Sequence, residues 1–195
     1  MKNYKKFILL IILILILLLV FFLIQIFAKY LTSASGDTSM NIARWNILVN
    51  DISIKENTDI TNTLSPVFPG NENIAPDIIA PTAEGYFDLN FDFSDADVSF
   101  EYEITTTVDP NSSVKDLVVT GYSVDDGQKV ELTNNSSIKD TILLTDTINN
   151  RKIRVFVKWD DGNNASMDNS QDTIATTSGK PALLKVNVSF TQIAN

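Results

Sequence analysis

Apolar residues follow two different patterns along this chain, and the change lies near residue 30. Residues 7–24 form an unbroken apolar run, which resumes after Gln25 through residues 26–28. At 1.5 Å per residue, a helix of this length reaches roughly 30 Å, about the thickness of the hydrocarbon core of a bilayer. Residues 7–28 are therefore predicted to form a helix that crosses or anchors in a membrane.

The residues beside this segment predict its orientation and leave its cleavage open. Three lysines precede it within the first six residues, whereas Lys29 alone follows it directly. Lysine is enriched on the cytoplasmic side, so residues from about 30 onward are expected to face outward. A secretory signal usually has a shorter apolar stretch of about 7 to 15 residues, which favours a permanent anchor. Thr32 and Ala34 nevertheless fit the positions before a signal-peptidase cut at Ser35, so secretion after cleavage near Ala34 stays an alternative.

Period-two alternation of apolar and polar residues dominates the rest of the chain. It occurs at residues 45–49, 87–93, 98–104, 153–159 and 184–190, with shorter runs at 116–124, 129–133 and 138–145. Alternation of this kind is typical of β-strands with one buried face. Roughly seven or eight such strands, separated by polar turns, predict an all-β fold, an antiparallel immunoglobulin-like or jelly-roll sandwich.

The remaining segments are predicted to be turns, loops and one linker. Residues 109–112 and 125–127 carry the residue types of tight turns. Residues 55–83 are rich in Pro, Asn and Thr, which indicates a long connection or a loop that covers a sheet edge. No amphipathic helix, internal repeat or second domain is predicted in this part. The chain divides into a membrane anchor or signal segment (1–29), a linker (30–42) and an extracytoplasmic β-sandwich domain (43–195).

Charge is distributed very unevenly between these parts. All 24 acidic residues follow residue 34, and 11 of the 15 basic residues accompany them, so the outer part has a net charge of −13. Nucleic-acid binding depends on cationic neutralisation of phosphates. We therefore expect no nucleic-acid partner.

The side chains that most enzymes use are missing. The chain has no histidine and no cysteine, which removes histidine acid–base catalysis, Ser-His-Asp triads and cysteine nucleophiles. Residues 178–180 read Ser-Gly-Lys but lack the upstream glycine of a phosphate loop, so no nucleotide site is expected. Paired carboxylates can hydrolyse glycosides, and Asp88, Asp92, Glu101 and Glu103 lie on the polar faces of predicted strands, but solubility alone explains their alternation with apolar residues. We expect a protein that is not an enzyme.

One acidic loop is a candidate site for a hard cation. It contains the oxygen-bearing side chains of Asp160, Asp161, Asn163, Asp168 and Asp172. Calcium takes several oxygen ligands of this kind, although the spacing does not fit an EF-hand. The sequence therefore predicts a calcium site here, with a solvated acidic loop as the alternative.

Aromatic residues suggest a second function class. The side chains considered for a sugar-binding platform are those of Trp45, Trp159, Tyr86, Tyr102 and Tyr122. Several of them lie in strand patterns, where aromatic side chains are commonly buried. The alternative function is therefore a carbohydrate or cell-wall polymer binding module, with or without calcium.

The order of short motifs resembles a known family. The motifs are Ala43–Ile47, Pro69-Gly70, Phe100–Ile104, Val157–Trp159, Gln171–Thr173 and Phe190–Ile193, all after an apolar N-terminal segment. This order is similar to that of the exported TasA and camelysin-like proteins of Gram-positive bacteria. The resemblance implies a secreted sandwich that assembles into matrix fibres by donating an N-terminal segment as a strand to the next subunit.

The functional prediction combines these observations. We expect a cell-envelope structural or interaction protein that is displayed on the cell surface or secreted as a biofilm-matrix fibre subunit. Its expected partners are the membrane, through residues 7–28, and further copies of itself by strand addition. Residues 35–42 would be the donor strand, although Met40 and Ile42 are their only sizeable apolar side chains.

Overall fold

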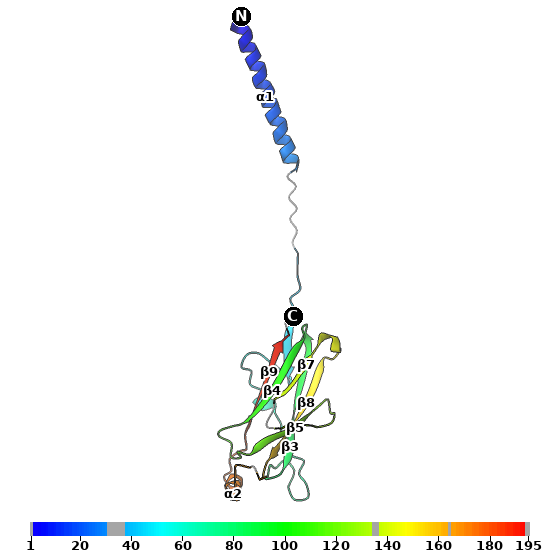
Figure 1. The fold of residues 1–195 in the computed structure, drawn as a ribbon, viewed down its shortest axis with the longest axis vertical. Coiled ribbons are helices and arrows are strands. Elements are labelled where there is room, and N and C mark those ends of the chain that lie inside the picture. Colours follow the sequence, from blue (N-terminus) through cyan, green and yellow to red (C-terminus); the bar gives the residue numbers. More distant parts are fainter. Residues whose placement is uncertain (1, 31–37, 134–136, 164, 194–195) are drawn as a thin grey trace. The chain divides into compact units, whose positions relative to one another are not determined.

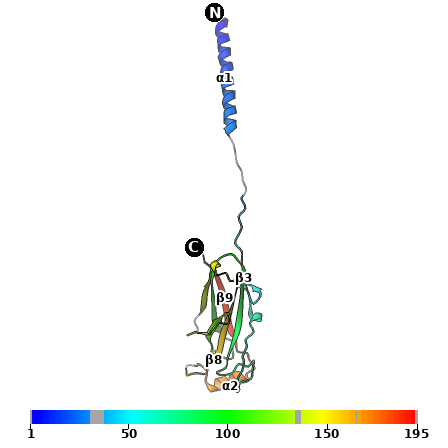
Figure 2. The same ribbon diagram turned by 90° about the vertical axis from the view of Figure 1, so that its right-hand side faces the viewer.

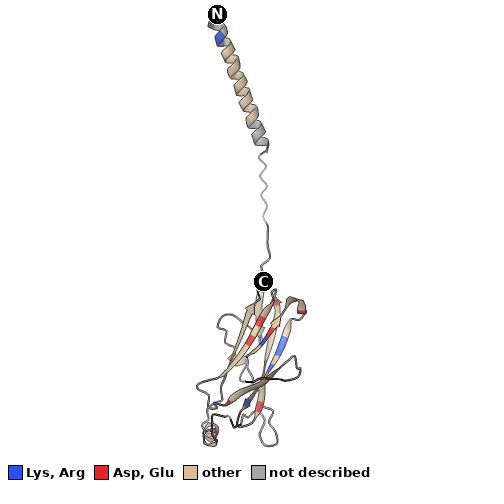
Figure 3. Ribbon diagram, in the orientation of Figure 1, with Lys and Arg blue, Asp and Glu red and all other residues tan. Residues whose placement is uncertain are grey.

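The N-terminal segment forms a single long helix. The computed structural model describes residues 2–30, 38–133, 137–163 and 165–193, and within the helix the side chains of residues 4–23. Helix α1 (Lys2–Tyr30) contains a stretch, Tyr4–Leu23, with a mean hydropathy of 3.4, and every side chain described there is exposed. The helix is long and apolar enough to cross a membrane, as a permanent anchor or as a signal segment (Figures 1 and 3).

The chain divides into two compact units, Met1–Asn41 and Ile42–Asn195. Residues 31–37 of the predicted linker lie outside the described residues, and so do Thr32, Ala34 and Ser35 of the candidate cleavage site. The second unit holds every strand of the described residues.

In the described residues, nine strands form two antiparallel sheets. They are β1 (Trp45–Val49), β2 (Ile52–Ser53), β3 (Glu84–Ala96), β4 (Phe100–Val108), β5 (Leu117–Val124), β6 (Val130–Glu131), β7 (Ile138–Ile142), β8 (Asn150–Trp159) and β9 (Leu184–Gln192). The large sheet has the order β2-β1-β3-β8-β5-β6, and the small sheet has the order β7-β4-β9. The two sheets form the layers of a sandwich (Figures 1 and 2). The prediction of an antiparallel all-β fold is confirmed.

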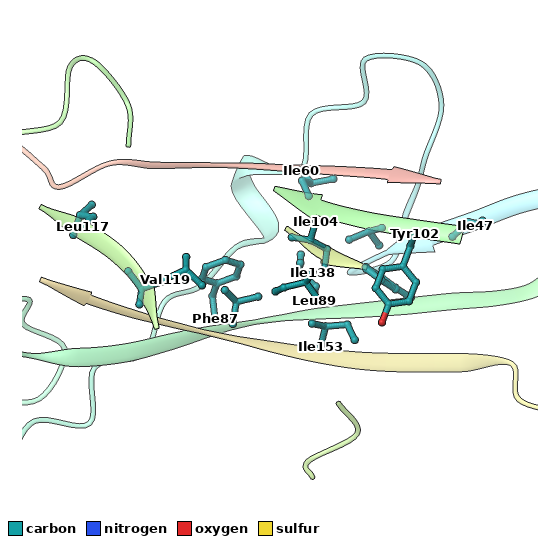
Figure 4. Packing of buried hydrophobic residues seen from close by; sticks show 14 of the residues in the cluster. Ile47, Ile60, Phe87, Leu89, Tyr102, Ile104, Leu117, Val119, Ile138 and Ile153 are labelled. Carbon is teal, nitrogen blue, oxygen red and sulfur yellow. The ribbon is translucent and has the colours of Figure 1, made fainter. Parts of the chain in front are cut away.

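The core lies between the two sheets and is built from alternate residues of the strands. Leu89 of β3 and Ile153 of β8 are opposite each other in the large sheet, and both are fully buried. Tyr102 of β4 crosses the interior, where its ring lies 5.2 Å from that of Phe91 (Figure 4). These residues belong to the period-two runs, so the alternation seen in the sequence separates the core face from the solvent face.

A long connection between β2 and β3 closes one side of the sandwich. It contains a short 3₁₀ turn (Thr61–Thr63) and contributes the buried side chain of Ile60 to the core. Val67 forms a bridge to Tyr86, and a Cβ atom on the adjacent Gly85 would lie 2.6 Å from the Val67 carbonyl oxygen. Glycine is therefore needed where the connection crosses β3.

The prediction that no helix follows the membrane segment is wrong, because α2 (Asn169–Thr177) is helical. Its start is a capping box: Asp168 accepts from the Gln171 backbone N–H (2.9 Å), and the Gln171 side chain accepts from the Asp168 N–H (2.9 Å). Only Asp172 and Ala175 of the helix are buried. The narrow buried face and the threonine-rich composition explain why the apolar pattern did not indicate a helix.

Candidate interaction site

Strand β9 is the longest edge strand of the described sandwich. The edge strands β2 and β6 of the large sheet have two residues each. Edge strand β7 has five residues, and its Lys139 lies 3.2 Å from Glu103 of β4. Strand β9 has nine residues, with no proline, no acidic residue and no register shift against β4. Short, charged or bulged edges discourage pairing, and β9 is neither short nor bulged and has Lys185 as its one charged residue; the connection of residues 54–64 lies beside it without pairing as a strand.

The hydrogen bonds at the two ends of β9 show which backbone groups face the free edge. The Ile193 N–H donates to the Ser99 carbonyl (2.9 Å), and the Asp109 N–H donates to the Leu183 carbonyl (3.0 Å). Both bonds fit the continuous β4–β9 register. Hydrogen-bonded pairs alternate along an antiparallel ladder. The odd-numbered residues of β9 therefore bond to β4, and the even-numbered residues direct their N–H and C=O groups outward.

The same even-numbered residues carry the apolar side chains of β9. Leu184, Val186, Val188 and Phe190 pack against the core cluster, but each is only half-buried. The Phe190 ring lies 5.2 Å from that of Phe91. Apolar side chains that stay half-exposed at an unpaired edge leave surface that an added strand would bury.

Two hollows flank this free edge. One has a volume of about 480 Å³ and lies between Trp45, Ile54 and residues 188–190. The other has a volume of about 530 Å³ and lies between residues 58–64 and residues 183–187. Figure 4 shows Ile60 beside the strand that carries the colour of β9. We name the free edge of β9 and these hollows (residues 54–64 and 183–190) the β9 trough.

The β9 trough has no net charge although the chain is acidic, because Lys55 and Lys185 balance Glu56 and Asp59. Lys185 is the single charged residue of β9, and its Nζ lies 3.2 Å from a carboxylate oxygen of Asp109. The segment of residues 54–64 lies beside the edge, and in the described part of the chain it adds no strand to β9. The trough is therefore an edge with free backbone groups, apolar side chains and room beside them.

The predicted calcium ligands are divided among different roles. Asp160 lies 3.5 Å from the Nζ of Lys158, and Asp168 caps α2. Asp161 and Asn163 are exposed, whereas Asp172 is buried. Within the described ranges, no group of three or more acidic side chains is placed to hold a metal ion. The calcium site stays a prediction, and calorimetric unfolding in excess calcium and in chelator would test it.

Asp172 lies in an unfavourable environment for a carboxylate. Burial raises its pKa, and the neighbouring carboxylates of Asp161 and Asp116 raise it further. Asp172 Oδ1 and Trp159 Nε1 are both buried, and neither forms a hydrogen bond with a described residue. Asp116 differs, because it accepts three hydrogen bonds from Ser166 and Met167.

Asp172→Asn is therefore expected to raise the unfolding temperature at neutral pH. A raised folded-state pKa means that ionisation costs the folded state stability as pH rises above the unfolded value of about 3.9. The gain from asparagine should shrink as pH falls toward this value and vanish below it. Calorimetry over this range measures the difference, with Asp161→Asn as the exposed control that should gain less. A lower unfolding temperature for Asp172→Asn at neutral pH would contradict this account.

The structure separates the aromatic residues considered for a sugar platform. Trp159 and Tyr102 are buried, at 2% and 1% exposure, so neither presents a ring to a ligand. Tyr86 lies under the guanidinium of Arg154 at 3.9 Å, on the outer face of the large sheet. Trp45 packs edge-on against Phe100 of the other sheet. The burial that strand patterns favour is therefore found for Trp159 and Tyr102, and these residues do not form one platform with Tyr86 on the outer face.

Comparison with known proteins does not assign a family or a function to this chain. No protein-family model matches the sequence, and no curated protein matches it.

Proposed function

We propose that this protein is a non-catalytic structural or interaction protein of the cell envelope, which assembles by accepting an extended segment in the β9 trough. The observation that carries the proposal is the nine-residue free edge of β9, whose outward backbone groups and half-buried side chains belong to the same residues. Strand addition to such an edge supplies backbone hydrogen bonds for affinity and side-chain pockets for specificity.

The helix α1 supports a location at the membrane. Three lysines before its apolar stretch favour an inward N-terminus, which places the sandwich outside the cell. The length of the apolar stretch favours a retained anchor over a cleaved signal. The motif order that resembles TasA and camelysin-like proteins favours the same class of exported, self-assembling sandwich. In this proposal the protein works at the cell surface, or in the matrix after cleavage near Ala34.

The side-chain pattern of the β9 trough defines the segment that it would accept. An added strand places alternate residues toward the core, beside Val186, Val188 and Phe190. Those inward positions favour apolar side chains where they face Trp45 and Ile47, although Lys55 and Glu56 also line the hollow around Phe190. The outward positions can be polar. The accepted segment is therefore an amphipathic strand of low negative charge, since the chain itself is strongly acidic.

Val188→Pro tests this function with little expected effect on folding. The Val188 N–H faces the free edge, so proline removes a donor that the fold does not use, and its ring blocks an added strand. We expect the self-association of the full chain in detergent micelles to weaken at least tenfold, that is, by about 1.4 kcal/mol or more. Sedimentation velocity over a dilution series measures this change.

Val188→Ala is the matched control. It removes similar apolar contacts but keeps the N–H, so its self-association should be weakened less than that of Val188→Pro. Circular dichroism establishes whether both variants keep their strand content. Equal association of the wild type and Val188→Pro, with both folded, would rule out β9 as the acceptor edge.

A further inference from the structure

We infer that the segment accepted by the β9 trough is β9 of a second copy of this chain, paired antiparallel about a two-fold axis at Asn187. The inference rests on the proposed function, because it names the partner of the same edge. A two-fold contact that uses one surface twice is the commonest arrangement in homo-oligomers.

The outward backbone groups restrict the registers that two β9 strands can adopt. Only even-numbered residues of β9 offer free N–H and C=O groups, so an even residue must be opposite an even residue of the second copy. An axis at Asn187 satisfies this rule. The four hydrogen-bonded pairs from Leu184 to Phe190 then exchange about eight backbone hydrogen bonds.

The inward side chains are complementary in this register. Leu184 is opposite Phe190 of the second copy, and Val186 is opposite Val188 of the second copy. All four half-buried apolar residues of each β9 thus gain an apolar partner, and aliphatic–aromatic and β-branched pairs stabilise antiparallel strands. An axis at Val188 would instead place Leu184 opposite the polar Gln192, so the axis at Asn187 fits better.

The outward side chains are compatible with the same register. Lys185 is opposite Ser189 of the second copy, and Asn187 is opposite its own counterpart. No two charges of the same sign are directly opposite, although the chain as a whole has a net charge of −9. Like charges opposite each other destabilise strand pairs. β9 is therefore able to pair with itself despite the acidic surface around it.

Other segments of the chain fit the trough less well. Of the predicted donor strand, residues 38–42 are described, and they offer the exposed side chains of Met40 and Ile42. Strand β9 offers four apolar side chains at the required spacing. Edge strand β7 has the pattern Ile-Lys-Asp-Thr-Ile over five residues, with only its two ends buried. The second copy's β9 is the occupant that fills the most inward positions.

Single cysteines test the register directly, because the chain has no cysteine of its own. In the inferred dimer, Asn187 and its counterpart form a non-hydrogen-bonded pair with a Cα separation of about 4.5 Å, which a disulfide can span. We expect Asn187→Cys to give a disulfide-linked dimer of the full chain in micelles under mild oxidation. Asn187 is exposed, so the substitution leaves the core unchanged.

Lys185→Cys and Ser189→Cys are the matched controls, because both side chains are exposed on the same face of β9. Each lies about 13 Å along the strand from its own counterpart, so neither alone should cross-link. Mixing the two variants should give the mixed dimer, because position 185 is opposite position 189. Cross-linking of Lys185→Cys alone, or of no variant or mixture, would overturn the inference.

The two proposals can fail separately in these experiments. If Asn187→Cys does not cross-link but Val188→Pro still weakens association, the trough accepts another segment, such as residues 38–42, and only the β9 pairing is wrong. If the wild-type chain does not associate at any concentration, both proposals are wrong. A dimer linked through Asn187→Cys and weakened by Val188→Pro supports both.

Discussion

Phe100→Ala is expected to lower the free energy of unfolding of the β-sandwich by about 3–5 kcal/mol. Phe100 is 1% exposed and lies on the central strand of the small sheet. Its ring contacts those of Trp45, Phe93 and Phe190, with centroid distances of 5.8, 5.4 and 5.9 Å. Truncation leaves a cavity between β1, β3, β4 and β9, which the rigid sheets can only partly fill.

Urea unfolding followed by tryptophan fluorescence measures this loss, because both tryptophans lie in strands of the sandwich. Trp45 is the first residue of β1, and Trp159 is the last residue of β8. Phe156→Ala is the control, because Phe156 lies on the outer face of the large sheet and is only half-buried against Tyr86. We expect it to cost about 1 kcal/mol, as is usual for a half-exposed pair. Equal losses for the two variants would mean that the core does not lie between the sheets.

The double substitution Leu13→Asp and Leu17→Asp is expected to lower strongly the fraction of the protein retained in membranes. Both residues lie within the apolar stretch Tyr4–Leu23, in which no acidic residue occurs. A charged residue at the centre of a membrane helix costs about 2.5–3.5 kcal/mol for insertion, so two cost about 5–7 kcal/mol. The apolar residues of the stretch gain roughly 0.3–0.6 kcal/mol each on insertion, so the two aspartates offset much of the insertion free energy of the helix.

Carbonate extraction of membranes followed by immunodetection measures the retained fraction. The control is Leu13→Ala with Leu17→Ala, which keeps the segment apolar and should keep the protein in the membrane fraction. Strand content by circular dichroism should be the same for all variants, because the sandwich is a separate compact unit. Full retention of the aspartate variant would show that the helix does not hold the protein by insertion.

The strands could be predicted from the sequence because each has one face in the core. The alternation at residues 87–93 and 153–159 became β3 and β8, which are neighbours in the large sheet. Helix α2 was not predicted because only Asp172 and Ala175 are buried, so its sequence shows no apolar residues at helical spacing. The available signal was local: Asp168 followed three residues later by Gln171, the pattern of a capping box.

The position of β9 at a sheet edge could not be predicted from its pattern. Residues 184–190 alternate like those of a central strand, and pairing partners depend on contacts far apart in sequence. The absence of acidic residues from 184 to 193 in so acidic a chain was the signal that this strand differs. The calcium candidates cluster in the sequence, but the described structure gives Asp160 an ion pair, Asp168 a helix cap and Asp172 a buried position, and the calcium site stays a prediction.

Hydrogen exchange of individual β9 amides tests the central claim most directly, because strand addition at this edge must protect particular N–H groups. In dilute full-length protein, the amides of Leu184, Val186, Val188 and Phe190 should exchange fast, while those of the odd-numbered residues, bonded to β4, exchange slowly. At concentrations where the protein associates, the even-numbered amides should become slow as well. Association that leaves the even-numbered amides fast would contradict the claim that β9 accepts a strand.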